Sequence, residues 1–116
     1  MTKIFLGVFI PALVWCAVTP AGVAEVFSAP AKIVWVENGW FEEGLAFKVE
    51  PQSGVAGCPT SDDEFSLEAS REDFYLISSM ILTAFSTGAN VIVTIHDTGD
   101  CAFGGRNKVE SVKLVK

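Results

Sequence analysis

Several residues that could do acid–base chemistry lie together near the C-terminal end of this chain. His96 is the only histidine, and Asp97-Thr98-Gly99 follows it. That triplet carries the catalytic carboxylates of aspartic proteases, where two of them share a proton. Those enzymes have an apolar residue in place of His96, and too few residues follow Gly99 for the strands that their fold requires. Asp, Thr and Gly are also common where a chain leaves a strand, so we predict a turn and no catalytic residue.

The same stretch and an acidic stretch upstream are weak candidates for metal binding. Residues 96–101 contain one histidine, two acids and a cysteine, which is a poor zinc set if the cysteine is oxidised. Residues 62–64 are all acidic but lack the spaced acids and the glycine of a calcium loop. Gly104-Gly105 lacks the lysine and the following helix of a phosphate loop. The sequence therefore predicts no metal site and no cofactor.

Two segments combine aromatic and polar side chains in the way that a sugar site requires. They are residues 37–43 and residues 98–107. Aromatic rings stack on the apolar face of a sugar, while polar groups supply directional hydrogen bonds. The alternative is that the aromatic residues of the first segment cover the core or form a subunit interface, where such residues are also enriched. The candidate ligand-contacting residues are Trp40, Phe41, Asp100, Phe103 and Arg106.

The N-terminal stretch has the pattern of an export signal. Lys3 is followed by an uncharged run over residues 4–18, and the small residues of 22–24 precede the first acid. A positive end, a short apolar run and a small-residue cleavage site are typical of a secretory signal peptide. The run is shorter than the roughly 20 residues that span a bilayer.

We therefore expect residues 1–24 to be a signal peptide that is cleaved near Ala24. A retained anchor and a lipoprotein signal ending at Cys16 are the alternatives. Residues 25–116 would then form one domain in the periplasm or outside the cell, with no membrane contact after cleavage.

The composition of the chain indicates an acidic globular domain. Half of the residues are apolar and 19% are charged, with a net charge of −6, which excludes a disordered chain. The acidic excess argues against a nucleic-acid partner, because phosphate binding needs clustered lysine and arginine. Cys58 and Cys101 are the cysteines outside the leader. In an exported domain we expect them to form a disulfide, with two free thiols as the alternative.

Strand patterns occupy most of the remaining sequence. Residues 44–50 alternate, with Leu45, Phe47 and Val49 on one face. Asn38-Gly39 is a strong hairpin signal, so this strand should pair with the one before it. Turn residues predict loops at 51–63 and 98–107. The expected strands cover residues 31–41, 44–50, 64–68, 90–97 and 108–115.

Residues 71–87 have the pattern of one helix. Ser70 is the expected N-cap, with acidic residues in the first turn. Gly88 stands where a C-terminal glycine cap belongs. The apolar positions cover much of the circumference, so the helix should plug a core. They are Phe74, Leu76, Ile77, Met80, Ile81, Leu82, Ala84 and Phe85.

Three strands, a helix and two further strands are in the order of the OB-fold, a small five-stranded Greek-key barrel. An α+β arrangement with the helix on a meander sheet is the alternative. OB-folds bind ligands near the loop that joins strands one and two and the loop that joins strands four and five. In this chain those loops are the two segments with the candidate ligand contacts.

The run DFYLISSMILTAFSTGANVIVTIHDTGDC at residues 73–101, with the upstream Cys58 before EFSLE, carries a family resemblance. Its features are an aromatic-led helix that ends in Ser86-Thr87-Gly88, a β-branched strand directly after it and a second cysteine. It resembles the B subunits of subtilase-cytotoxin-like and typhoid-toxin-like AB5 toxins. This resemblance implies an OB-fold, a ring-shaped homopentamer and glycan binding.

The first hypothesis for function is thus an exported binding protein without enzymatic activity. Its ligand would be a glycan or a protein, and it could act as a homo-oligomer. The alternatives are a small periplasmic enzyme or inhibitor that uses residues 96–106, and a structural component of the cell envelope.

Overall fold

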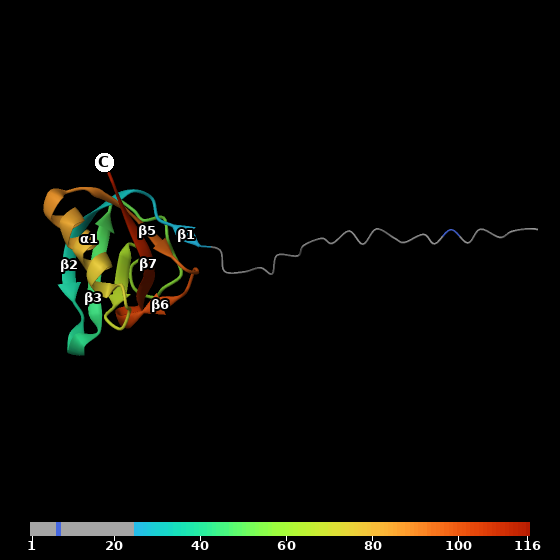
Figure 1. Cartoon of the computed structure of the whole chain (residues 1–116), viewed down its shortest axis with the longest axis horizontal. Coiled ribbons are helices and arrows are strands. Elements are labelled where there is room, and N and C mark those ends of the chain that lie inside the picture. The colour runs from blue at the N-terminus through green and yellow to red at the C-terminus, as the bar shows by residue number, and fades with distance from the viewer. Residues whose placement is uncertain (1–6, 8–24) are drawn as a thin grey trace, which may run out of the picture.

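The computed structural model describes Gly7 and residues 25–116, and it is mainly β with a single α-helix in that part of the chain (Figure 1). The expected signal peptide, with Cys16 and the cleavage site at Ala24, lies outside the described residues. The strands are β1 (Val26–Phe27), β2 (Ala31–Asn38), β3 (Gly44–Glu50), β4 (Glu64–Glu68), β5 (Asn90–Ile95), β6 (Cys101–Ala102) and β7 (Arg106–Val115). Helix α1 spans Phe74–Thr87, and two single-turn 3₁₀ helices, Trp40–Glu42 and Phe103–Gly105, lie in loops.

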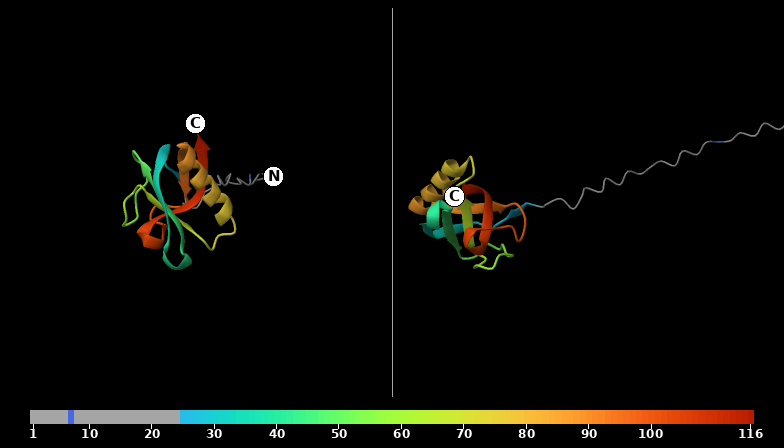
Figure 2. Two further views of the ribbon diagram at one scale, coloured as in Figure 1. Left: turned by 90° about the vertical axis from the view of Figure 1, so that its left-hand side faces the viewer. Right: turned by 90° about the horizontal axis from the view of Figure 1, so that it is seen from below.

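The strand pairings form a closed circuit. β2 pairs antiparallel with β3, and β3 pairs antiparallel with β4. β4 then runs parallel to β7, β7 pairs antiparallel with β5, and β5 returns to β2 at Ala31 and Lys32. β1 and β6 add short pairings to β5 and β7. Figure 2 shows these strands curving around a common interior, with α1 on one side.

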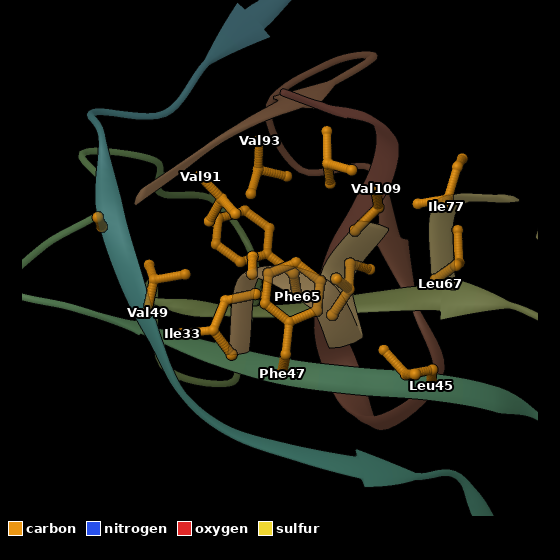
Figure 3. Close-up of a cluster of buried hydrophobic side chains, with 14 of the residues drawn as sticks. Ile33, Leu45, Phe47, Val49, Phe65, Leu67, Ile77, Val91, Val93 and Val109 are labelled. Atoms are coloured by element: carbon orange, nitrogen blue, oxygen red, sulfur yellow. The ribbon is translucent and has the colours of Figure 1, made fainter. Parts of the chain in front are cut away.

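The interior is filled by the side chains that the strand pattern predicts (Figure 3). Leu45, Phe47 and Val49 are buried, as the alternation in β3 predicts. The rings of Phe47 and Phe65 stack with their centroids 5.4 Å apart. Burial of such large apolar side chains is the main contribution to the stability of a domain this small.

Helix α1 begins later than the sequence predicts. Its N-cap residue is Asp73, which makes no side-chain cap hydrogen bond, so the prediction of a cap at Ser70 and acids in the first turn is wrong. Residues 69–73 form turns instead. The C-terminal prediction is confirmed, because Gly88 has φ 72° and its N–H donates to the carbonyl oxygen of Ala84 at 2.9 Å.

The burial of α1 also differs from the prediction. The residues of α1 that are buried are Ile77, Ser78, Ile81 and Ala84. Leu76, Leu82 and Phe85 are exposed by 65%, 47% and 45%. The helix packs one stripe onto the core that the strand circuit encloses and turns the opposite stripe to solvent (Figure 2).

Several strand boundaries need correction. The strand expected at 31–41 ends at Asn38, and the strand expected at 90–97 ends at Ile95. The segment 98–107 contains β6 and the start of β7, because its glycines let it fold back into a short pairing. β1 was not expected, since a two-residue strand is too short to have a pattern.

The predicted disulfide is present. Cys58 and Cys101 are bonded with an S–S distance of 2.07 Å, which joins the loop after β3 to β6. A structural disulfide fits an extracellular or periplasmic protein, because those compartments are oxidising. In the described part of the chain, no helix has the length and apolar character needed to cross a membrane.

Candidate functional site

The connection between β2 and β3 places two aromatic rings in solvent. The loop closes through the N–H of Gly39, which donates to the carbonyl oxygen of Gly44 at 2.7 Å. Between them, Phe41 and Glu42 have φ values of 51° and 64°. This left-handed conformation turns the chain back without the two-residue Asn-Gly turn that the sequence suggests. Trp40 and Phe41 are consequently 79% and 93% exposed.

Hydrogen bonds and a close backbone contact hold this hairpin tip in place. The Oε2 of Glu43 accepts from the N–H of Trp40 at 3.2 Å, and the N–H of Glu43 donates to the carbonyl oxygen of Trp40 at 3.1 Å. The carbonyl oxygen of Glu43 accepts from the N–H of Ala69 at 3.0 Å, which ties the tip to the chain after β4. A side chain at Gly44 would collide with the carbonyl oxygen of Leu67. The exposed rings therefore stand on a well-supported backbone.

The side chains of Phe103 and Arg106 contact the β2–β3 hairpin. A Cβ atom added to Gly39 would lie 2.9 Å from Cε2 of Phe103, so this ring packs on the backbone of Gly39. The carbonyl oxygen of Phe103 accepts from the hydroxyl of Ser66 at 2.9 Å, which anchors the loop on β4. The chain between β5 and β7 thus meets the β2–β3 hairpin. The sequence predicts this meeting for residues 98–107 and 37–43.

Arg106 uses its side chain within the protein. Its Nη2 lies 2.7 Å from Oε1 of Glu37, and its Nε lies 3.5 Å from Oε1 of Glu64. The guanidinium carbon is 5.9 Å from the ring centroid of Trp35. This arrangement combines two ion pairs with a cation–π contact, so Arg106 fixes the base of the hairpin.

Asp100 has no hydrogen bond to the hairpin tip among the described residues and lies in the turn before β6. Its N–H donates to the carbonyl oxygen of Asp97 at 3.1 Å, and its own carbonyl oxygen accepts from the N–H of Lys108 at 3.0 Å. These bonds place Asp100 in the turn beside the disulfide at Cys101. Of the candidate residues, the structure thus gathers Trp40, Phe41, Phe103 and Arg106 around one hairpin and leaves Asp100 outside.

An open groove of about 680 Å³ lies between the hairpin and the start of α1. Its polar lining side chains include Asn38, Glu42 and Ser70, and its aromatic wall is Phe74 and Tyr75. Tyr75 is 82% exposed. The groove therefore offers an amide, a carboxylate and a hydroxyl beside an aromatic ring, which can hydrogen-bond and stack on a hydroxyl-rich ligand.

The contribution of α1 to this groove was missed in the sequence. The sequence predicts Ser70 as a helix cap and indicates no role for Tyr75. The relevant signal was that Tyr75 lies off the buried stripe of Ile77, Ile81 and Ala84. That the helix start meets the hairpin depends on tertiary packing, which the sequence pattern does not encode.

His96 and Asp97 are exposed just after β5. His96 follows the last strand residue, Ile95, although the sequence predicts that the strand continues to residue 97. Within the described residues, no three histidine, cysteine, aspartate or glutamate side chains gather closely enough to hold a metal ion.

Comparison with known proteins identifies no family for this chain. No protein-family model matches the chain, and no curated protein matches it in sequence.

Proposed function

We propose that this chain is an exported, non-enzymatic carbohydrate-binding protein built on an OB-fold. Support for the fold comes from the circuit β2–β3–β4–β7–β5, in which α1 connects β4 to β5 and the third strand runs parallel to the last. This is the connectivity of a five-stranded Greek-key barrel with a helix between strands three and four. Support for export comes from the signal-peptide pattern of residues 1–24 and from the disulfide.

The observation that carries the proposal is the exposure of Trp40 and Phe41 on a supported hairpin tip. Large aromatic side chains are costly to leave in water, and here two adjacent ones extend from a left-handed turn. Their ring centroids are 6.5 Å apart with planes tilted by 59°, so they present two separate faces. Such faces suit the apolar sides of sugar rings, against which aromatic groups stack.

The polar surroundings favour a neutral ligand with many hydroxyl groups. Glu42 and Glu43 directly follow the aromatic pair, and the whole chain has a net charge of −6. Carboxylates accept hydrogen bonds from hydroxyls but repel phosphates, so a nucleic acid is disfavoured. The groove with Asn38 and Ser70 next to the tip would extend the site along a chain of sugar units.

The proposal is tested by probing a glycan array with the purified protein. We expect binding to a defined set of glycans and loss of that binding in Trp40→Ala. Phe27→Ala is the matched control, because Phe27 is also exposed, by 64%, but lies on β1. Far-UV circular dichroism of each variant checks that the fold is retained.

An array without signal for the wild-type protein would overturn the carbohydrate ligand. Signal that survives in Trp40→Ala, with the fold intact, would overturn the site. Equal losses in Trp40→Ala and Phe27→Ala would also contradict it, because the effect would then not be specific to the hairpin.

A further inference from the structure

The solvent-facing side of α1 carries no charge and combines large apolar side chains with small hydroxyl side chains. All 14 residues of the helix, Phe74–Thr87, are uncharged, in a chain with a net charge of −6. Surface helices of globular proteins normally present charged residues on the face opposite the core. Here Tyr75, Leu76 and Leu82 are exposed by 82%, 65% and 47%. Large apolar side chains gathered on an exposed face are typical of an interaction site.

The serine and threonine hydroxyl groups on this face already donate hydrogen bonds within the helix. Those of Ser79, Thr83 and Ser86 donate to the carbonyl oxygens four residues earlier, at 2.7, 2.7 and 2.8 Å. A covering partner would therefore leave none of these three donors without an acceptor. Burying an unsatisfied hydroxyl would cost free energy, so these bonds make the face suitable for burial.

Large and small residues alternate along the exposed stripe. Its residues are Tyr75, Ser79, Leu82 and Ser86, at spacings of four, three and four, which keeps them in one line on a helix. If two copies of the stripe pack antiparallel, Leu82 of each copy faces Ser79 of the other, and Tyr75 faces Ser86. Each large side chain then meets a small one, as interdigitating layers require. The stripe is complementary to itself in this orientation.

We propose that α1 is the contact surface of a symmetric dimer, with a second copy of this chain as the occupant. A two-fold axis brings the same patch of both copies together, which the self-complementary stripe permits. The charge distribution also favours a second copy as the occupant, because two acidic molecules repel each other least where neither has a charged side chain at the contact. A basic partner would instead bind the acidic surface elsewhere. The dimer proposal rests on different observations from the carbohydrate proposal, and the two surfaces share Tyr75 at the edge of the groove.

The test is the mass of the purified protein by light scattering and by sedimentation over a range of concentrations. We expect twice the monomer mass for the wild type and at least a tenfold weaker dimer in Leu82→Glu, which places a charge opposite Ser79. Phe27→Glu is the matched control and should remain a dimer, because β1 lies on the other side of the molecule from α1 (Figure 1).

A wild-type monomer at every concentration would overturn the dimer. So would a larger ring whose mass Leu82→Glu leaves unchanged. An amide NMR dilution series gives a second measurement if the variant fails to fold. Shifts that depend on concentration should cluster at Tyr75, Ser79, Leu82 and Ser86, and shifts confined to the strands would contradict the proposal. Trp40→Ala should still form the dimer, so failure of the carbohydrate proposal remains a separate result.

Discussion

Arg106 and Glu37 form an ion pair between β7 and β2, with Nη2 2.7 Å from Oε1 across 69 residues of sequence. The side chain of Arg106 is 17% exposed, and Glu64 on its other side is 15% exposed. The side chain of Glu37 is 51% exposed, so its pair with Arg106 resembles a surface ion pair, whereas the longer Arg106–Glu64 pair is shielded from water. The Arg106–Glu37 pair connects the first residue of β7 to β2, the strand that leads into the hairpin tip.

Replacing Arg106 should therefore destabilise the protein. In Arg106→Gln we expect the free energy of unfolding to fall by about 1–2 kcal/mol, because Glu64 is left without its charged partner. Urea unfolding measures the change. Lys113→Gln on the same strand is the control, since Lys113 is exposed and forms no ion pair in the described part of the chain. Equal effects in the two variants would contradict the role of Arg106.

Gly39 should tolerate no side chain. Its backbone conformation is ordinary, with φ −70°, but an added Cβ would lie 2.8 Å from Cβ of Glu43 and 2.9 Å from Cε2 of Phe103. We expect Gly39→Ala to lower the free energy of unfolding by about 1–3 kcal/mol, as overpacking does. Asn38→Ala, one residue earlier and exposed, should stay within about 0.5 kcal/mol of the wild type. A fully stable Gly39→Ala variant would show that Phe103 does not pack there.

Reduction of the disulfide should weaken the fold strongly. Cys58 and Cys101 are 43 residues apart, and closing a loop of that length stabilises by about 3–4 kcal/mol in the chain-entropy model. We expect this loss both in reductant and in the variant with Cys58→Ser and Cys101→Ser. Urea unfolding with and without dithiothreitol measures it. If the double variant matches the oxidised wild type, the bond does not carry this stability.

Arg71 should hold the start of α1 against β7. Its Nε and Nη2 lie 2.9 and 3.0 Å from the two carboxylate oxygens of Asp73, and Nη2 also donates to the carbonyl oxygen of Glu110 at 2.8 Å. We expect Arg71→Ala to lower the free energy of unfolding by about 1–3 kcal/mol. Arg71→Lys should recover little of it, because a lysine lacks the planar fork that binds both oxygens. Thermal unfolding, with the exposed Glu72→Ala as control, measures the difference.

The sequence pattern predicts the strands and the helix well where one physical signal dominates. Alternation over 44–50 places Leu45, Phe47 and Val49 in the core, where they are found. Gly88 ends the helix in the left-handed conformation that glycine adopts most easily. In these places local preference and tertiary packing favour the same structure.

The sequence-based predictions fail where tertiary packing determines the local structure. The hairpin turn uses Phe41 and Glu42 in left-handed conformation although Asn38-Gly39 stands beside them, because contacts to Gly44 and Ala69 determine the loop. The apolar positions of α1 indicate a helix buried on most sides, yet the strand circuit covers one stripe only. Composition alone does not show which apolar residues face the core and which remain for a partner.

The candidate site shows the same division. The sequence draws attention to the aromatic pair Trp40 and Phe41, because it directly follows the turn signal Asn38-Gly39. It does not show that Arg106 is held by Glu37 and Glu64, because ion pairs over such separations arise only when β7 closes the circuit. Nor does it place Tyr75 beside the hairpin.

The most direct test of the central claim is the indole N–H signal of Trp40 in a ¹H–¹⁵N NMR titration with the strongest glycan from the array. Trp40→Phe assigns the signal, and the half-buried Trp35 serves as an internal reference. If sugar stacks at the hairpin tip, the Trp40 signal shifts with increasing glycan until saturation, while the Trp35 signal stays in place. A glycan that binds while the Trp40 signal remains unmoved would contradict the account.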